Sequence, residues 1–294
     1  MGDRIACVPR SSVFSAEAVL SRRNGNGIVF EALEIFEANS LTRQILDIQA
    51  IGNTKYELMR LALLLHLERR CLRQEHFSPW DGYIHGLPKS TPNSLFLDAG
   101  QIDQFMCGGG CNEVRAEFYR TIDQDQRFFA AMTSSLLDDL QNEGFVSSDV
   151  CSQGDFEASL RWAYSTMQSR AHFFEVWNVA GPVPLIDMAN HDSLGDANAA
   201  LDVPQEPAST AQRAERNAWH REAGAVGEEA EAEMVMLIAT CDIDAGQEVL
   251  IDYGCDNNES LLRSYGFVDP RYPSHPGPSQ AERTTILSTP YTVD

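Results

Sequence analysis

Basic residues are scarce in this chain. Its 294 residues include 22 Lys and Arg against 43 Asp and Glu, which gives a formal net charge of −21. Proteins that bind duplex nucleic acid depend on cationic contacts with phosphate, so this balance argues against nucleic acid as a direct partner. A basic segment of another protein would instead be attracted. A plainer alternative is that the acidity only keeps the protein in solution.

Long apolar runs are also missing. The longest, Leu58 to Leu67, is interrupted by Arg60 and His66 and is roughly 10 residues long, whereas a membrane-spanning helix needs about 20. The first ten residues are too few and too polar for the apolar region of a secretory signal. We therefore expect a soluble protein in the cytoplasm or nucleus, or in the chloroplast if a targeting segment precedes the first residue. The sequence leaves the oligomeric state open, and we favour a monomer.

The cysteines follow neither a disulfide pattern nor a zinc pattern. They number seven and are widely scattered, unlike the even, closely spaced frameworks of small secreted domains. Cys107 and Cys111 flank three glycines, but no second Cys or His pair stands at zinc spacing. The sequence thus favours a reducing compartment and predicts no metal site.

The middle of the chain, from about residue 28 to 165, has the apolar period of helices. Residues 54–57 (Thr-Lys-Tyr-Glu) match a capping box, and the leucines after them form a stripe that predicts a helix to about Arg73. Two further stripes predict helices from near Asn112 to Leu140 and from Asp155 to Met167. We interpret all three stripes as core rather than as cofactor sites.

The sequence pattern changes after Val176. Short apolar runs now alternate with Gly, Asp and Asn residues, which is typical of strands joined by turns and loops. Residues 202–233 are rich in Pro, Ala and Glu and predict a mobile surface insertion. Residues 271–294 predict a disordered tail. The predicted strands are 4–8 near the N-terminus and 183–186, 235–238 and 249–251 in this later part.

Three segments in the last third of the chain give the strongest functional signal. They are Val-Pro-Leu-Ile-Asp-Met-Ala-Asn-His at 183–191, Asp-Ala-Gly-Gln-Glu-Val-Leu-Ile-Asp-Tyr-Gly at 244–254, and Asn-Glu-Ser-Leu-Leu-Arg-Ser-Tyr-Gly-Phe-Val at 258–268. Each would be weak alone, because short pairs such as Asn-His occur by chance. Together and in this order they resemble the SET-domain protein methyltransferases, specifically the branch of the Rubisco large-subunit lysine methyltransferases.

Two upstream segments extend this resemblance. Residues 55–88, ending in Ser-Pro-Trp-Asp-Gly-Tyr-Ile-His-Gly-Leu-Pro, are similar to the branch's helical insert, and residues 162–174 to the segment that leads back into the SET core. The resemblance implies an α+β fold, in which small β-sheets form a threaded-loop core and a helical lobe is inserted. The implied divisions are an N-terminal part of the core at 1–39, the helical insert at 40–160 and the C-terminal part of the core at 161–270.

The resemblance also implies a reaction, methyl transfer from S-adenosylmethionine to a protein lysine. A lysine is mostly protonated at neutral pH, so the site must desolvate the amine and remove its proton. It must also hold nitrogen, methyl and sulfur in line. In the family, the tyrosine of the Tyr-Gly motif lies beside the transferred methyl, so Tyr253 is the implied catalytic residue and a cofactor contact. Asn190 and His191 resemble the family's other cofactor contacts.

Three further residues are implied at the substrate side of the site. Asp187 corresponds to a position that lines the target-lysine channel, and Tyr265 to an aromatic wall of that channel. Arg170 matches a position that contacts both the cofactor carboxylate and the substrate edge, which suits a fixed cation. The family's aromatic residue two positions after this arginine is replaced here by His172, so cofactor packing is expected to differ.

The chain departs from the family near both ends. Members carry a Gly-x-Gly segment before a Val-Pro strand, whereas Val-Pro stands here at residues 8–9, and no helical substrate-binding domain is expected in the short stretch after Pro270. Without the Gly-x-Gly segment, the chain supplies only the half of the cofactor site that contains Asn190 and His191. We expect these two residues to lie next to Tyr253 in the folded protein.

Other hypotheses stay open. The missing Gly-x-Gly segment leaves a SET-like interaction module without activity as an alternative, and related members of the branch methylate histidine rather than lysine. Asp187, His191, Asp192 and Asp252 could form the hard-ligand cluster of a metal hydrolase. No His-x-x-x-His pair or comparable spacing supports that last hypothesis.

Overall fold

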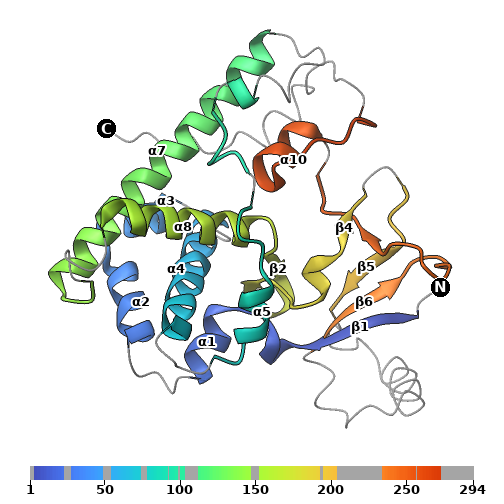
Figure 1. The fold of residues 1–294 in the computed structure, drawn as a ribbon, viewed down its shortest axis with the longest axis horizontal. Helices are drawn as coiled ribbons and strands as arrows, with labels where there is room; N and C mark the ends of the chain where they lie inside the picture. Colours follow the sequence, from blue (N-terminus) through green and yellow to red (C-terminus); the bar gives the residue numbers. More distant parts are fainter. Residues whose placement is uncertain are drawn as a thin grey trace. The chain divides into compact units, whose positions relative to one another are not determined.

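The computed structural model divides into two compact units, each built from separated pieces of the chain (Figure 1). The first unit combines Met1–Glu31, Glu57–Leu87 and Arg170–Gly254, and the second combines Ala32–Tyr56, Pro88–Ser169 and Cys255–Asp294. The described residues are 3–22, 28–48, 54–73, 78–91, 93–98, 100–102, 112–146, 152–192, 195–203, 234–255 and 257–272. The predicted insertion at 202–233 and tail at 271–294 lie, except for their first two residues, outside these ranges.

The first unit contains the strands. An antiparallel sheet has the order β1-β6-β5, formed by β1 (Arg4–Pro9), β6 (Met234–Ala239) and β5 (Ala199–Asp202). A second antiparallel pair joins β2 (His172–Phe174) to β3 (Val179–Gly181), and a short parallel pair joins β4 (Asn190–His191) to β7 (Leu250–Ile251). Because β1 pairs with β6, the beginning of the chain and its late segment share one sheet.

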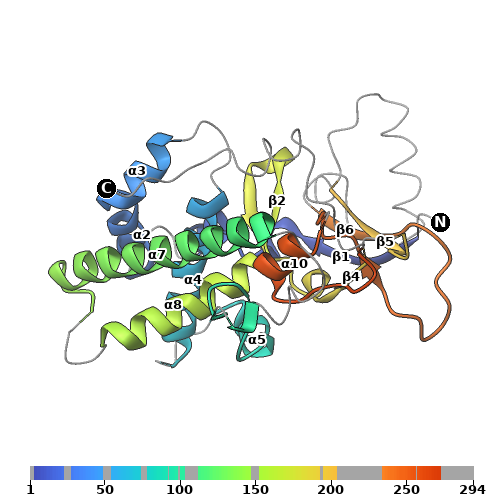
Figure 2. The ribbon, with the colours of Figure 1, turned by 90° about the horizontal axis from the view of Figure 1, so that it is seen from above.

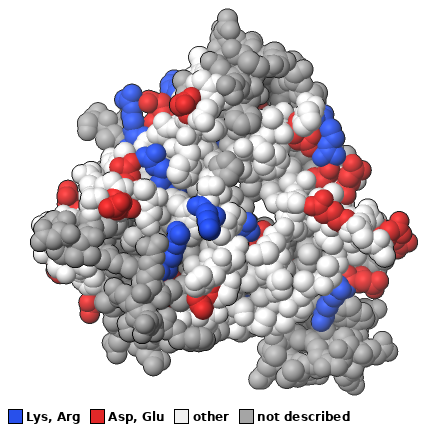
Figure 3. All heavy atoms as spheres, in the orientation of Figure 1, with Lys and Arg blue, Asp and Glu red and all other residues white. Residues whose placement is uncertain are grey.

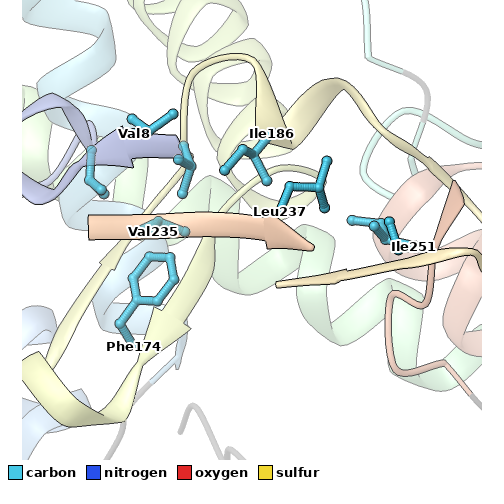
Figure 4. Close-up of a cluster of buried hydrophobic side chains, with 9 residues drawn as sticks. Val8, Phe174, Ile186, Val235, Leu237 and Ile251 are labelled. Atoms are coloured by element: carbon cyan, nitrogen blue, oxygen red, sulfur yellow. The ribbon is translucent and has the colours of Figure 1, made fainter. Parts of the chain in front are cut away.

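Buried apolar side chains from these strands and from the segments next to them form one core (Figure 4). Alternate strand residues point to the same face, so Val235 and Leu237 of β6 both reach it. Ile186 and Ile251 are almost fully buried in the same cluster. The full set is Val8, Val13, Phe174, Val183, Ile186, Ala199, Val235, Leu237 and Ile251.

Helices of the first unit are α1 (Ala16–Arg22), most of α4 (Thr54–Arg73) and α5 (Asp81–Gly86). The predicted helix from residue 54 to Arg73 is confirmed. However, α4 is buried around its whole circumference from Leu61 to Glu68, not along one stripe. A helix that is apolar on all sides is an interior helix.

Helix α5 is anchored to the N-terminal segment by Trp80, which directly precedes it. The indole Nε1 donates to the Ser12 carbonyl at 3.1 Å, and the ring packs edge-on against Phe14 at 5.4 Å between centroids. The Phe14 carbonyl also touches Gly181 so closely that an added Cβ would lie 2.3 Å from its oxygen. Glycine is therefore required at this point, where β3 ends.

The second unit is helical. It contains most of α2 (Ile28–Ala38), α3 (Ser40–Ile48), α7 (Asn112–Asn142), α8 (Gln153–Gln168) and α10 (Asn258–Tyr265). Figure 2 shows α7 and α8 side by side, and the two helices pack on each other. Their buried apolar residues are those that gave the sequence its helical period, so the predicted helices from Asn112 and from Asp155 are confirmed.

Side-chain caps and ion pairs reinforce these helices. Ser152 accepts a hydrogen bond from Asp155 N at the start of α8, and Asn257 caps α10 in the same way through Ser260 N. Asp125 of α7 accepts from Lys55 Nζ at 2.9 Å. It also accepts from Arg263 Nε of α10 at 2.7 Å.

Three predicted strands are confirmed and one is wrong. β1, β6 and β7 match the runs at 4–8, 235–238 and 249–251. The run at 183–186 is a turn that leads into a 3-10 helix at Ile186–Met188, because Pro184 has no N–H for a ladder and Leu185 takes a positive φ of 76°. Among the described residues, no helix combines the length and apolar character needed to cross a membrane.

Candidate active site

The turn from Pro184 to Ala189 sorts its side chains to opposite sides. Ile186 is fully buried in the core and the Asp187 side chain has no exposed surface, whereas Leu185 is 70% exposed and Met188 50%. At φ 76° and ψ −51°, Leu185 has a backbone conformation that is rare and strained for a residue with a side chain. The turn thus brings a carboxylate into the interior two residues after a strained position.

Two donors hold one oxygen of the Asp187 carboxylate. The Tyr83 hydroxyl of α5 donates to Oδ2 at 2.6 Å. Arg170 Nη1 donates to the same oxygen at 3.3 Å and to the Asp187 backbone carbonyl at 3.0 Å. The other oxygen, Oδ1, is buried and has no hydrogen-bond partner among the described residues. A buried carboxylate oxygen without a donor is costly and uncommon in native proteins.

Burial shifts the ionisation of these groups. Desolvation raises the pKa of Asp187 above its ordinary value, and the hydrogen bond from Tyr83 and the charge of Arg170 oppose that rise. Burial, followed by the charge of Asp187, raises the pKa of Tyr83 well above 10, so this hydroxyl stays protonated and can only donate to the carboxylate. Burial also raises the pKa of Tyr253, partly offset by Arg170.

The Asn190–His191 strand meets the Tyr253 segment, as predicted. β4 and β7 pair in parallel, so the residue that follows β7 by two positions reaches back to β4. Tyr253 N donates to His191 Nδ1 at 3.1 Å, and the two rings stack with centroids 4.9 Å apart. The Tyr253 hydroxyl donates to the Ala189 carbonyl at 2.8 Å. Having donated its proton, this oxygen can act toward a further group only as an acceptor.

Asn198 fixes the parallel pair from the side. It is 2% exposed, and its carboxamide accepts from Leu250 N at 2.9 Å and donates to the Glu248 carbonyl at 2.8 Å. Its backbone N donates to the Leu250 carbonyl. A two-residue ladder has few bonds of its own, so this buried amide helps to fix β7 and the start of the Tyr253 segment.

Asn190 and His191 lie in different environments although they are neighbours. The Asn190 side chain is exposed and donates to Glu248 Oε1. The His191 side chain is 1% exposed, and its acceptance of a bond at Nδ1 favours the tautomer protonated at Nε2. Asn190 can therefore reach a ligand with its side chain, whereas His191 contributes to the site by packing against the Tyr253 ring.

Tyr265 ends α10 in the second unit, where its ring lies 6.3 Å from that of Phe267. Its expected place in a lysine channel stays a prediction. Within the part of the chain that the structure describes, no group of three or more His, Cys, Asp or Glu residues is arranged to hold a metal ion.

On the face of the molecule seen in Figure 3, the described residues form no patch of a single charge sign. On the face in Figure 3, described Asp and Glu side chains are interspersed with Lys and Arg. The candidate site is defined here by its buried polar groups.

Sequence reasoning missed three residues of this arrangement, Tyr83, Glu248 and Asn198. Tyr83 stands within the segment that resembles the helical insert, and Glu248 within the Tyr-Gly motif, but neither residue type alone marks a site. For Tyr83 the partner is 104 residues away in sequence. Only the fold brings the two together.

Solved structures that are similar to this chain include three of the same kind of protein. The SET domain of LSMT bound to lysine and AdoHcy matches with a TM-score of 0.54 and 19% identity, over 92% of this chain and 48% of that one. Rubisco LSMT bound to AdoMet matches with a TM-score of 0.50 and 18% identity, over 92% and 47%. The SET domain of LSMT bound to methyllysine and AdoHcy matches with 0.52 and 17%, over 92% and 48%.

The matches to solved structures agree on the architecture of the chain. The chain spans about half the length of these solved structures. A scan against models of protein families and a search of curated proteins find no match. The small sheets and the helical unit described above, together with these matches, give the chain the α+β fold of the SET domain.

Proposed function

We propose that this protein transfers a methyl group from S-adenosylmethionine to the side-chain amine of a protein lysine. The observation that carries the proposal is Asp187 Oδ1, a buried carboxylate oxygen with no partner among the described residues. Such an oxygen suits a cationic or N–H donor guest. Solved proteins of the same fold are bound to lysine or methyllysine and to AdoMet or AdoHcy, which supports the same pair of ligands here.

The polar groups present fit the cofactor. Bound S-adenosylmethionine supplies an electrophilic methyl group on a sulfonium, and it also carries a carboxylate and an ammonium. The Arg170 cation suits the carboxylate, and the exposed Asn190 carboxamide offers both a donor and an acceptor. The Tyr253 hydroxyl oxygen is an acceptor that suits the polarised methyl.

Asp187 and Tyr253 would prepare the amine. The ionised Asp187 carboxylate would attract the lysine ammonium into the site, and burial would lower the pKa of that ammonium by penalising its charge. The raised pKa of Asp187 brings the acid strengths of the two groups closer, which eases transfer of the proton from the nitrogen to the carboxylate. The Tyr253 oxygen would then orient the neutral amine, and its bond to the Ala189 carbonyl holds the phenol in place.

The decisive experiment is transfer of tritium from labelled S-adenosylmethionine to protein. Core histones, ribosomal proteins and Rubisco large subunit serve as the probe substrates, and mass spectrometry of the product identifies the modified residue. Tyr253→Phe should lower transfer about 100-fold, as removal of one well-placed polar group does in other enzymes. Tyr272→Phe is the matched control, because its hydroxyl bonds the Cys255 carbonyl within the second unit, and it should retain transfer within about twofold.

Calorimetric titration with S-adenosylhomocysteine separates the outcomes. Binding together with transfer to lysine supports the proposal. Binding without transfer to any probe contradicts it and favours an interaction module. Transfer to histidine keeps the methyltransferase activity but contradicts the lysine assignment.

A further inference from the structure

The Tyr83 hydroxyl makes a short bond to the buried carboxylate at the centre of the candidate site. It comes from α5, whereas Asp187 lies in the turn after β3, and the donor–acceptor distance is 2.6 Å. The bond falls on Oδ2, the oxygen that Arg170 also contacts. The two donors therefore crowd onto one oxygen and leave Oδ1 without a partner among the described residues.

We propose that Tyr83 is a positioning residue for the reaction: by bonding Oδ2 it fixes the Asp187 carboxylate so that Oδ1 receives the target amine. This inference rests on the proposed function, because that proposal identifies the bound group as the lysine amine. The bond between Tyr83 and Asp187, however, can be tested without any substrate.

A purely structural role for the hydroxyl is less consistent with the surroundings of α5. Trp80 already anchors this helix through its bond to the Ser12 carbonyl and its packing on Phe14. Ile84 and Leu87 are each 6% exposed and add apolar burial. The aromatic ring of Tyr83 can fill its space without the oxygen, so the hydroxyl is the part of the side chain that α5 does not need.

Arg170 alone would hold the carboxylate less well. Its Nη1 is 3.3 Å from Oδ2 and closer, 3.0 Å, to the Asp187 carbonyl, so it divides its bond between the two acceptors. Without the Tyr83 hydroxyl the carboxylate could turn and bring both oxygens toward the guanidinium, in the bidentate geometry that Arg prefers. Oδ1 would then no longer be available to an amine.

A consequence for pH dependence follows from the groups that face Asp187. They are Tyr83 from α5, Arg170 before β2 and Tyr253 after β7. The Tyr83 bond favours the ionised carboxylate, so its loss raises the pKa of Asp187 further. If the ionised form binds the amine, activity disappears at low pH as Asp187 is protonated, and this acid limb moves to higher pH when the bond is removed.

The first test compares wild type with Tyr83→Phe in methyl transfer to the probe substrate that wild type modifies. We expect KM for the protein to rise about tenfold and the acid limb of kcat/KM to move up by roughly one pH unit. The dissociation constant of S-adenosylhomocysteine should stay within about twofold of wild type. A loss that is equal at all pH values, with an unmoved acid limb, overturns the proposal. Trp80→Phe is the matched control and should lower stability without moving the limb.

The second test needs no activity. In a double-mutant cycle of Tyr83→Phe and Asp187→Asn, the unfolding equilibrium constant should show coupling of about tenfold between the two changes. Absence of coupling overturns the Tyr83 inference even if transfer is observed. Coupling in a protein that transfers no methyl group contradicts the proposed function and leaves the Tyr83–Asp187 bond in place, so the two failures are distinguishable.

Discussion

The two units of the chain are stabilised in different ways. The second unit follows local rules: α7 and α8 bury the faces that their apolar periods define, and Ser152 and Asn257 cap helices. In the first unit Leu185 takes a strained backbone conformation, and the buried Asp187 carboxylate has an oxygen with no donor among the residues that the structure describes. Burial also raises the pKa of Tyr83, Asp187 and Tyr253 and lowers that of His172, all of which belong to the first unit.

This difference indicates that the first unit contains conformations that are unfavourable for folding stability. Backbone strain persists only where the surrounding structure enforces it, and it gathers at functional sites. The first unit is therefore the place to look for chemistry, and the second for support of the fold. Three pairs of substitutions test that contrast, since the same chemical change should have opposite effects in the two units.

The largest contrast is expected for an added methyl group. At Gly181 a new Cβ would lie 2.3 Å from the Phe14 carbonyl oxygen, so Gly181→Ala should destabilise the protein by about 2–3 kcal/mol. At Gly154, in the first turn of α8, the nearest atom is the Ser152 hydroxyl at 3.9 Å. Gly154→Ala should stabilise by about 0.5–1 kcal/mol through its helix propensity. Urea denaturation of both variants measures the two values, and equal effects would contradict the contrast.

An intermediate contrast is expected for removal of a carboxylate charge. Because the folded-state pKa of Asp187 is raised, its ionised form opposes folding above that pKa. As the pH falls through the raised value, protonation removes this penalty, and each pKa unit of rise corresponds to about 1.4 kcal/mol. Wild type should therefore gain stability relative to Asp187→Asn as the pH is lowered from 7 toward 4.

Thermal unfolding of both proteins across this range checks the sign of that effect, and a constant difference in Tm would contradict it. The comparison in the second unit is Asp125→Asn. It removes the charge that pairs with Lys55 and Arg263 and replaces one of the two acceptor oxygens by a donor, so it should lower Tm at neutral pH.

The smallest contrast is expected for substitution by glycine. Leu185 is 70% exposed at a strained φ, so Leu185→Gly relieves strain of about 1–2 kcal/mol and loses part of that gain to chain entropy. A net stabilisation of about 0.5 kcal/mol is expected. Ala158→Gly, at an exposed position of α8, should instead destabilise by about 1 kcal/mol. The denaturation midpoints of both variants, compared with wild type, measure these changes in stability. A destabilising Leu185→Gly would mean that the leucine side chain stabilises the turn.

Local patterns sufficed to predict the long helices. In α4, α7 and α8 each backbone bond joins near neighbours, so apolar period and capping residues contain most of the information. The run at 183–186 misled for the opposite reason. Its apolar residues correctly indicated burial of Val183 and Ile186, but Pro184 and packing against distant strands set the backbone as a turn.

The candidate site was only half visible in the sequence. The meeting of Asn190 and His191 with Tyr253 was predicted from a resemblance of motifs and is confirmed, while the roles of these residues stay predictions. Tyr83 was missed because a tyrosine in a short helix looks like any partly buried aromatic. Likewise, a carboxylate with one satisfied and one unsatisfied oxygen is a property of three-dimensional packing, which no motif encodes.

The pairing of β1 with β6 has a consequence for synthesis on the ribosome. β1 emerges well before its sheet neighbour, because β6 belongs to a later piece of the first unit. Until β6 arrives, β1 has exposed backbone donors and acceptors of the kind that promote aggregation. In the same way, the Tyr83 hydroxyl cannot form its hydrogen bond until Asp187, 104 residues downstream, has been synthesised. Translation must therefore pass β6 before the sheet can form. The contacts between Tyr253 and His191 form later still, because Tyr253 follows β6 in the sequence.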